Sequence, residues 1–350
     1  MREEEPAVRV TQLEGRRHSA VALAALIGIC CGALIACVVL LGGCQARQPS
    51  PDSGIGFDAA SVSDTSAGPA AAASAASQAA SAAATAAYAD NSALAQAVTE
   101  LCEPYGADVS VAYIPLGGAE MPAAYSLNGG IQRPSASMIK LLILADLLEQ
   151  SSSGQVSLDG TLTMTAKDIV GGTGSMQSMG AGTSLSVRQV AQYMITVSDN
   201  TGANMLIDLL GMDAINQEAD DLGLTSTRLE RKMMDTAAQA AGRENLTSAD
   251  DMALLLSSMG GGTLVDEASS QLAVSFLNGQ ELDEGLAAGL PAGIEVGHKT
   301  GSLSNAFHDG GIVWADKPYV LVVMTGNLSE PSATRVISSV SAAVYQATNG

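Results

Sequence analysis

The sequence predicts an α+β domain of three layers (α/β/α), in which one antiparallel sheet is built from both ends of the domain and carries helices on its faces. Patterns typical of strands occur near the start of the domain and again near its end, whereas helical patterns fill the middle. The middle is long enough to form an inserted, all-helical subdomain. The junction of this insert with the sheet is the expected place for a pocket.

The first part of the domain predicts one helix and two strands. A helical pattern runs from Asn91 to about Pro104. The alternation in Asp108–Ile114 indicates a strand, and Ala123–Leu127 follows a glycine-rich turn as a second strand. These strands supply the N-terminal share of the sheet.

Helices are expected throughout the middle of the domain. Ser186 and Ser248 have the position and side chain of N-caps, and Gly211 and Gly260 have those of helix stops. The expected helices are Ser137–Gln150, Ser186–Val197, Gly202–Leu210, Met212–Leu222, Ser248–Met259 and Ser269–Leu277.

The last part of the domain returns to strand patterns. Gly293–Thr300, Ala306–Trp314 and Tyr319–Thr325 are expected strands, and the last two are joined by the turn Ala-Asp-Lys-Pro. A closing helix is expected over Ser332–Gln346.

The residues before the domain predict an export segment and a linker. Residues 1–18 are expected to form a cytoplasmic leader ending in Arg16-Arg17-His18, and 19–44 an apolar segment that begins with 25 uncharged residues. About 20 such residues span a hydrocarbon core. Residues 45–90 are rich in Ala, Ser, Gly and Pro, which bury too little apolar surface to fold, so they predict a linker. The folded domain is then 91–350, outside the membrane.

The apolar segment ends in Leu40-Leu-Gly-Gly-Cys44, which resembles a bacterial lipobox. That resemblance favours a lipoprotein whose lipidated Cys44 becomes the mature N-terminus. An uncleaved transmembrane anchor is the alternative, because the leader and the apolar run are long for a lipoprotein signal. Both predictions place the domain on a tether at the extracytoplasmic face of a bacterial membrane.

Charge and cysteine content argue against two classes of function. A formal net charge of −20 disfavours nucleic-acid binding, which needs clustered Lys and Arg. Cys102 is the one cysteine in the folded part, so neither an intrachain disulfide nor a cysteine zinc site is expected there. No metal or other cofactor is predicted.

A serine and a lysine begin an otherwise apolar segment. On a helix, residues three apart share a face, so the amine of Lys140 can reach the hydroxyl of Ser137. The apolar run 141–145 predicts a buried helix, and burial lowers the pKa of a lysine until it can act as a base. Lys140 could then activate Ser137 as a nucleophile. The alternative is an ordinary core helix with a serine near its start and a lysine that reaches solvent.

Two further triplets strengthen the catalytic hypothesis. Ser198-Asp199-Asn200 lies between two predicted helices, and Lys299-Thr300-Gly301 ends a predicted strand. Alone, the first is typical of a capping turn and the second of a tight turn with an exposed lysine. Together with Ser-x-x-Lys, and in this order, they form the signature of class A β-lactamases and penicillin-binding proteins.

Residues from about 95 to 348 therefore resemble a class A β-lactamase-like domain of the penicillin-recognising serine hydrolases. The 61-residue step from Ser137 to Ser198 agrees with that family, as does the order of strands, helical insert and strands. Thr227–Arg231 resembles the start of the family's omega loop, and Thr247–Ala253 resembles the helix after it. The resemblance implies the β-lactamase/transpeptidase-like fold.

The resemblance also implies catalytic roles. Ser137 would be the acylated nucleophile and Lys140 its proton partner. Ser198 would pass a proton to the leaving nitrogen, and Asn200 would hold both the substrate amide and Lys140.

Four further residues would bind the substrate. Lys299 and Thr300 would bind its carboxylate. The backbone N–H groups of Ser137 and Ser302 would form the oxyanion hole, with Gly301 leaving room for close approach.

The sequence departs from the family at one important place. Members that turn over quickly carry an omega-loop glutamate that activates the deacylating water. Here that place falls at or near Met233, and no Glu-x-x-Leu-Asn follows. Asp235 and Glu244 are nearby carboxylates; Asp235 is a candidate substitute, with a loop cap or an ion pair as its alternative role. Methionine cannot accept a proton, so the sequence supports acylation and leaves fast hydrolysis without a base.

The predicted function is that of a β-lactamase-like serine hydrolase that opens a β-lactam amide through an acyl-enzyme on Ser137. Because the omega-loop glutamate is missing, its deacylation is expected to be slow or is left undetermined by the sequence. The first alternative is a peptidoglycan D-alanyl peptidase (carboxypeptidase or transpeptidase), or a related amide or ester hydrolase, acting on a D-Ala-ended peptide. The second is a catalytically weak cell-wall binding or sensing module. His298 and His308 are expected to be structural, since no Gly-x-Ser-x-Gly elbow accompanies them.

Overall fold

The computed structural model describes residues 89–350. The predicted leader 1–18, the apolar segment 19–44 with Cys44, and positions 45–88 of the predicted linker lie outside the described residues. Ala89 already forms a β-bridge to Pro122, so the paired backbone begins just before the expected boundary. No helix within 89–350 is long and apolar enough to cross a membrane.

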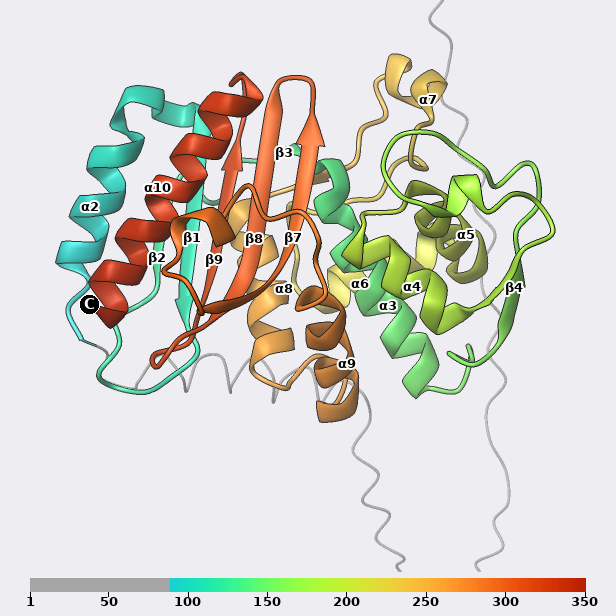
Figure 1. Ribbon diagram of the computed structural model, residues 1–350, viewed down its shortest axis with the longest axis horizontal. Coiled ribbons are helices and arrows are strands. Elements are labelled where there is room, and N and C mark those ends of the chain that lie inside the picture. Colours follow the sequence, from blue (N-terminus) through green and yellow to red (C-terminus); the bar gives the residue numbers. More distant parts are fainter. Residues whose placement is uncertain (1–88) are drawn as a thin grey trace, which may run out of the picture. The chain divides into compact units, whose positions relative to one another are not determined.

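The central sheet takes its strands from both ends of this part of the chain (Figure 1). Its order is β2-β1-β9-β8-β7, and every neighbouring pair is antiparallel. The strands are β1 (Val109–Pro115), β2 (Tyr125–Leu127), β7 (Glu295–Leu303), β8 (Ala306–Trp314) and β9 (Tyr319–Thr325). The predicted fold is confirmed, and β7, which carries Lys299, forms the edge facing the helical insert.

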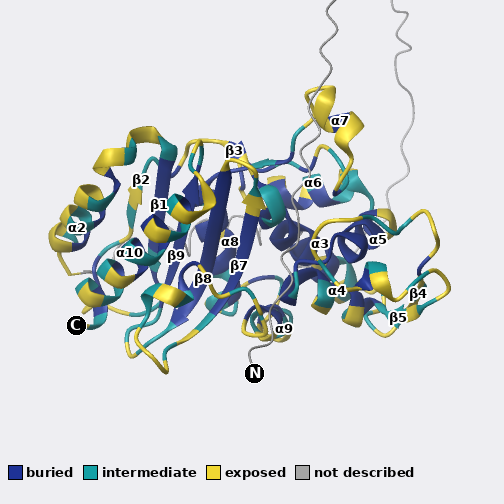
Figure 2. Cartoon of the chain, turned by 45° about the horizontal axis from the view of Figure 1, so that its top comes forward, coloured by how far each residue is buried: buried dark blue, intermediate teal, exposed yellow. Residues whose placement is uncertain are grey.

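Helices bury both faces of the sheet. Along β9, Tyr319, Leu321 and Val323 belong to the core under α2 (Ser92–Cys102) and α10 (Glu330–Asn349). The alternate residues Val320, Val322 and Met324 belong to the core shared with α8 (Ala249–Gly260) and the insert. Successive side chains of a strand point to opposite faces, so this strand is apolar throughout. Figure 2 shows the central strands as buried between the two helical layers.

The insert packs around one fully buried helix. In α3 (Lys140–Ser152), every residue from Lys140 to Leu148 is buried, as the apolar sequence predicted. Four further helices of this region share its hydrophobic core. They are α4 (Val187–Thr196), α5 (Asn200–Leu210), α6 (Met212–Asp221) and α9 (Glu267–Leu277).

The predicted helix caps agree with the structure, with one shift. Ser186 forms a capping box with Gln189, and the Ser248 side chain accepts the N–H of Asp251. Gly211, at φ 89°, ends α5. Gly260 is the last residue of α8 rather than the residue after it, and Gly261 is the C-cap.

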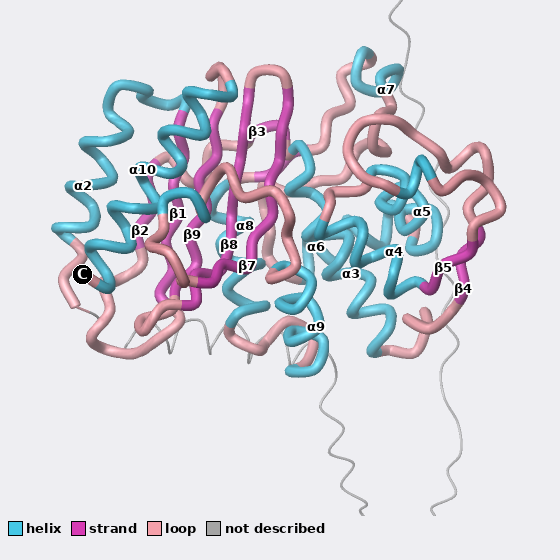
Figure 3. The backbone as a smooth tube through the Cα atoms, viewed as in Figure 1, coloured by secondary structure: helices cyan, strands magenta, loops and turns pink. Residues whose placement is uncertain are grey.

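The sequence did not indicate several short elements (Figure 3). The insert is not entirely helical, because two short ladders pair β3 with β6 and β4 with β5. Their two or three residues are too few to show a hydrophobic alternation. The remaining elements are β3 (Arg133–Pro134), β4 (Thr161–Thr163), β5 (Ser184–Ser186), β6 (Leu246–Thr247), α7 (Thr236–Ala240) and the 3₁₀ helices η1 (Glu103–Asp108), η2 (Ala136–Ile139), η3 (Met176–Ser178) and η4 (Ala287–Gly289).

Candidate active site

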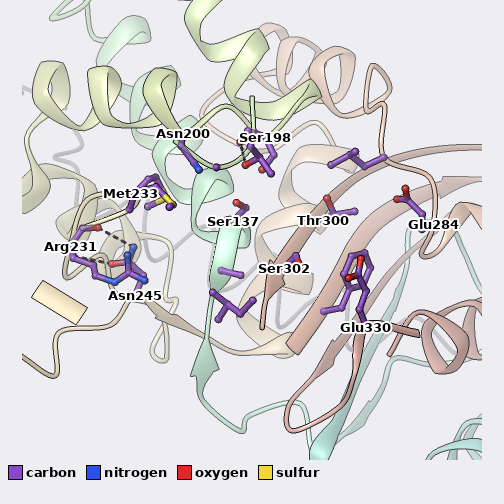
Figure 4. A pocket seen from close by; sticks show the side chains of 17 residues that line it. Ser137, Ser198, Asn200, Arg231, Met233, Asn245, Glu284, Thr300, Ser302 and Glu330 are labelled. Carbon is purple, nitrogen blue, oxygen red and sulfur yellow. Dashed lines mark hydrogen bonds between the residues drawn. The ribbon is translucent and has the colours of Figure 1, made fainter. Parts of the chain in front are cut away.

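A pocket of about 380 Å³ opens where the insert meets β7, as the fold predicted (Figure 4). The predicted site residues that line it are Ser137, Ser198, Asn200, Thr300 and Ser302. Lys140 and Lys299 lie behind them with no exposed surface. The structure thus brings together three motifs that are far apart in the sequence.

The nucleophile candidate lies on a 3₁₀ turn rather than on the α-helix expected from the sequence. Ser137 is part of η2, and α3 begins only at Lys140. Residues three apart are eclipsed in a 3₁₀ helix, so the expected contact remains. The Nζ of Lys140 lies 3.1 Å from the Oγ of Ser137.

The amine of Lys140 is surrounded by four oxygen atoms. Its Nζ lies 2.7 Å from the carbonyl oxygen of Ser198, 2.8 Å from Oδ1 of Asn200, 3.1 Å from Oγ of Ser137 and 3.2 Å from Oγ of Ser198. The carbonyl and amide oxygens can only accept. A neutral amine would satisfy both with its two hydrogens and keep its lone pair for a serine hydroxyl.

The surroundings of Lys140 favour this neutral form. Burial lowers the pKa of Lys140 well below its ordinary value, the positive charge of Lys299 lowers it further, and Asp199 acts in the opposite direction. Asn200 is itself oriented by its Nδ2, which donates to the carbonyl oxygen of Gly171 at 3.1 Å. The site therefore holds an amine, favoured in its neutral form, in a fixed position beside the hydroxyl of Ser137.

Ser198 links the two lysines. Its Oγ accepts from the Nζ of Lys299 at 3.0 Å and lies 3.2 Å from the Nζ of Lys140. The turn is held by Asp199, whose carboxylate accepts the N–H of Gly202 at 2.8 Å and that of Met176 at 2.7 Å. The triplet Ser198-Asp199-Asn200 therefore does form a capping turn, and Asp199 is the residue that caps α5. The hydroxyl of Ser198 therefore lies between the pocket and the amine of Lys140.

Lys299 and Gly301 complete the buried side of the site. Burial lowers the pKa of Lys299 to about 7, while the carboxylate of Asp309 opposes this shift. The Nζ of Lys299 also donates to the carbonyl oxygen of Thr300 at 2.7 Å. A Cβ at Gly301 would lie 3.1 Å from Met138 Cγ and 3.2 Å from Ala136 Cβ. Glycine at this position therefore leaves room for β7 to lie close to the nucleophile turn.

Three non-glycine residues at the pocket have strained backbones. Ala136, Ser198 and Met234 adopt φ angles of 48°, 54° and 62°, and all three line the cavity. L-residues avoid this left-handed region unless their surroundings impose it. The strained residues therefore lie next to Ser137, at Ser198 itself and in the segment 227–247, which forms one wall of the pocket.

The segment 227–247, which resembled an omega loop, closes on itself beside the pocket. Arg228 and Leu246 form an antiparallel bridge at its neck. Arg231 forms an ion pair with Glu244 at 2.6 Å, with side-chain exposures of 10% and 22%. Oδ1 of Asn245 accepts the N–H of Arg231 at 2.9 Å, so three contacts fix this wall of the pocket.

Met233 occupies the inner side of this wall. Its N–H donates to Oδ1 of Asn204 at 2.7 Å, and Nδ2 of Asn204 donates to its carbonyl oxygen at 3.0 Å. Figure 4 shows Met233, Arg231 and Asn245 on one side of Ser137, with Thr300 and Ser302 on the other. Met233 thus stands at the position where the omega-loop glutamate was expected, at the edge of the cavity.

Both nearby carboxylates have hydrogen-bond partners. Oδ1 of Asp235 accepts the N–H of Ala238 at 2.9 Å and caps α7. Glu244 is bonded to Arg231 and to Gln239. Of the roles expected for Asp235 from the sequence, the structure shows that of a cap.

Several pocket residues carried no signal in the sequence. Thr173, Leu282, Glu284, Phe307 and Glu330 line the cavity from loops and element ends. Such positions lack hydrophobic periodicity and belong to none of the three motifs. Only the folding of the chain brings them to Ser137.

The two histidines of the domain are both buried. Nε2 of His308 lies 3.0 Å from the carbonyl oxygen of Pro134, and Nδ1 accepts the N–H of Thr325 at 3.1 Å. Burial lowers the pKa of His308 to about 4, so this ring is neutral and holds the chain before the nucleophile turn. His298, on the same strand as Lys299, instead contacts Asp309 through its Nδ1 at 2.9 Å.

Within 89–350, no group of three His, Cys, Asp or Glu side chains could hold a metal ion.

Comparison with known sequences gives a consistent match. The sequence model of the β-lactamase enzyme family matches residues 93–348. A β-lactamase of Proteus vulgaris is 30% identical over 195 residues, which cover 54% of this chain and 71% of that protein. The extended-spectrum β-lactamase PER-1 of Pseudomonas aeruginosa is 28% identical over 234 residues, covering 61% and 74% of the two chains.

Solved structures agree with the sequence matches. The structure of PBP-A superposes with a TM-score of 0.67 at 28% identity, covering 74% of this chain and 97% of that chain. A PBP-A variant with a leucine replaced by glutamate, solved as an acyl-enzyme complex with penicillin G, gives 0.67 at 29% identity, covering 73% and 95%. The ancestral class A β-lactamase GNCA gives 0.65 at 28% identity, covering 73% and 99%.

Proposed function

The chain belongs to the β-lactamase enzyme family, and on that premise we propose that it opens β-lactams through an acyl-enzyme on Ser137 that is released slowly. One observation carries the proposal. The amine of Lys140 contacts the hydroxyls of both Ser137 and Ser198 inside a pocket that a small amide can enter.

Acylation follows from this arrangement. The lone pair of neutral Lys140 takes the hydroxyl proton of Ser137 as Oγ forms a bond to the lactam carbonyl carbon. When the carbon–nitrogen bond breaks, the leaving nitrogen takes a proton from the hydroxyl of Ser198, which is reprotonated by Lys140. Lys140 is then neutral again, and Ser137 carries the acyl group.

Substrate binding is assigned to β7 and the nucleophile turn. Lys299 is oriented by Ser198 and lies behind Thr300, so its charge can attract a substrate carboxylate that the hydroxyl of Thr300 binds. The N–H groups of Ser137 and Ser302 remain our candidates for the oxyanion hole, supported by the position of both residues on the same cavity.

Release of the acyl group is the step that this site supports least. Hydrolysis needs a base beside the attacking water, and the wall next to Ser137 presents Met233, whose thioether cannot take a proton. Glu244 and Asp235 have other partners. We therefore propose that deacylation is many times slower than acylation.

The same wall favours a second candidate function. An acyl-enzyme that water attacks slowly survives long enough to meet an amine acceptor, which suits a D-alanyl transpeptidase or carboxypeptidase acting on peptidoglycan peptides. A catalytically weak cell-wall sensor would likewise keep the adduct. These alternatives differ from the first proposal in what removes the acyl group.

Intact-mass measurements over time after mixing with benzylpenicillin test the proposal, beside hydrolysis of a chromogenic cephalosporin. We expect a single adduct that decays slowly with turnover, that is lost in Ser137→Ala and that is unchanged in Ser304→Ala, an exposed serine in the next turn. A permanent adduct with release of D-alanine from a cell-wall peptide would favour the peptidase. A permanent adduct without D-alanine release would favour the sensor, and no adduct would refute the acyl-serine mechanism.

We also propose that residues 19–44 tether the domain to the outer face of a bacterial membrane, with Cys44 as the lipidated residue. The support is the uncharged run and the Leu-Gly-Gly-Cys sequence that ends it. A mass change of the expressed protein on treatment with globomycin, absent in Cys44→Ala, is the expected result. Membrane retention that is insensitive to both would favour an uncleaved anchor.

A further inference from the structure

One wall of the pocket is formed by a segment without helix or strand. Residues 280–286 connect the end of α9 with η4, and Leu282 and Glu284 of this segment line the cavity. Figure 4 shows Glu284 on the same side of the pocket as Thr300. Because the segment has no secondary structure, its position depends on contacts with its neighbours.

The two ends of the segment are fixed by hydrogen bonds. At its start, the N–H of Glu281 donates to the carbonyl oxygen of Thr196 at 3.1 Å. At its end, the N–H of Leu286 donates to Oδ2 of Asp309 at 2.7 Å. A Cβ at Gly285 would lie 2.2 Å from that same oxygen, so the chain passes directly against the carboxylate.

His298 connects this carboxylate with the middle of the segment. Its Nδ1 lies 2.9 Å from Oδ1 of Asp309, and its Nε2 lies 3.5 Å from Oδ1 of Asp283. His298 is 1% exposed, whereas the side chain of Asp283 is 71% exposed. The imidazole thus bridges a buried strand residue and a pocket-wall residue that is otherwise in solvent.

The bridge requires a charged ring. Nδ1 donates to Asp309, since a carboxylate oxygen only accepts. The contact of Nε2 with Asp283 at 3.5 Å is an ion pair, which exists only when Nε2 also carries a hydrogen and the ring is charged. Burial alone would lower the pKa of His298, but the charges and hydrogen bonds of Asp309 and Asp283 outweigh it and raise the pKa. Of the described residues, Asp309 on β8 and Asp283 on the segment are the titratable groups that face the ring. Lys299, next to it on β7, points to the other face of the strand, toward Ser198.

We propose that His298 is a positioning residue, whose imidazolium fastens the wall segment 280–286 to β7 and β8 and so sets the width of the substrate pocket beside Thr300. The proposal rests on the proposed function of that pocket and adds control over how it binds substrate. Loss of the ring proton removes the bond to Asp283 and releases the middle of the wall.

The sign of the effect follows from the raised pKa. The imidazolium bridge is complete at pH values below that pKa and is lost as the pH rises through it. The wall segment then fluctuates, and substrate binding weakens. The acylation step at saturation is unaffected, since His298 contacts neither Ser137 nor Lys140.

Asp283→Asn tests this in the full chain, with Asp316→Asn, an exposed aspartate in the β8–β9 turn, as the matched control. At pH 6 we expect Asp283→Asn to raise the KM for a chromogenic cephalosporin about three- to tenfold with unchanged kcat, and to lower the protection of the Leu286 amide against hydrogen exchange. At pH values above the His298 pKa the two proteins should coincide, because the ring has lost its proton in both. Imidazole ¹⁵N spectra should show the His298 pKa falling in Asp283→Asn and unchanged in Asp316→Asn. The sequence holds three histidines, so its signals can be assigned.

A KM difference that persists unchanged above the His298 pKa measured by the imidazole spectra, or wild-type values for Asp283→Asn at pH 6, would overturn the proposal. His298→Gln, if it folds, should show at every pH the KM that the wild type has above that pKa. If the wild type forms no acyl-enzyme at all, the proposed function fails. The amide-exchange and imidazole measurements still decide whether His298 holds the wall segment through Asp283, because they need no substrate.

Discussion

Oδ1 of Asn200 accepts a hydrogen bond from the amine of Lys140 at 2.8 Å, and this acceptor carries no negative charge that would stabilise the ammonium form of the lysine. A carboxylate at the same place would stabilise the ammonium form, which cannot take the proton of Ser137. Asn200→Asp has nearly the same shape. We therefore expect it to slow acylation at pH 7 about 100-fold, the scale of a lost general base, and to move the pH dependence of acylation toward higher pH.

Stopped-flow acylation between pH 6 and 10 measures both effects. Gln155→Glu, in an exposed turn, adds the same charge away from the site and should leave the rate unchanged. Wild-type acylation by Asn200→Asp at pH 7 would mean that Lys140 is not the base.

Met233→Glu is expected to shorten the life of the acyl-enzyme. It places a carboxylate on the wall beside Ser137, where a water can be activated, so deacylation should rise about 100-fold while acylation changes little. The adduct lifetime by intact mass and the steady-state rate provide the measurement. Met233→Gln is the matched control, because it is polar and of similar size but cannot take up a proton. Equal acceleration by the two variants would show that polarity, and not basicity, limits release.

Glu244→Gln is expected to destabilise the wall that carries Met233. The side chain of Arg231 is 10% exposed and would lose its counter-charge, which costs on the order of 2 kcal/mol for a largely buried pair. The melting temperature should fall by about 4–8 °C in a domain of this size. Glu267→Gln, an exposed residue at the start of α9, is the control in the same thermal scan. An unchanged melting temperature would show that the segment is held without this ion pair, by its remaining backbone and Asn245 contacts.

The sequence predicted the parts of this molecule that follow periodic or motif rules. The strands from both ends, the buried helix after Ser137 and the contact with Lys140 follow from alternation, apolar runs and spacing. The contact of Asn200 with Lys140 was expected from the family resemblance. The contacts of Ser198 with both lysines were not predicted, because residue identity does not show where a side chain points.

The pocket wall shows the same limit more clearly. Leu282, Glu284 and Glu330 reach the cavity from a loop and a helix start that have no pattern of their own. His298 was expected to be merely structural, and its two carboxylate partners stand at Asp283 and Asp309, fifteen residues before and eleven after it. Only the pairing of β7 with β8 and the return of the loop bring the three together.

A buried pair of carboxyl groups between α3 and α6 should make the protein less stable as the pH rises. Burial raises the pKa of Glu218 to about 7, helped by Glu149, Asp146 and Asp221, and burial raises the pKa of Asp146 to about 6. Between about pH 4 and 7 the folded chain therefore holds protons that the unfolded chain has released, so the free energy of unfolding falls across this window.

Glu218→Gln keeps the shape of the side chain and is neutral at every pH. By urea unfolding we expect it to match the wild type near pH 4 and to be more stable by on the order of 2 kcal/mol at pH 8, whereas Glu267→Gln should follow the wild type throughout. If the free energy of unfolding changed with pH equally in Glu218→Gln and the wild type, Glu218 would have the same pKa in the folded and unfolded chain.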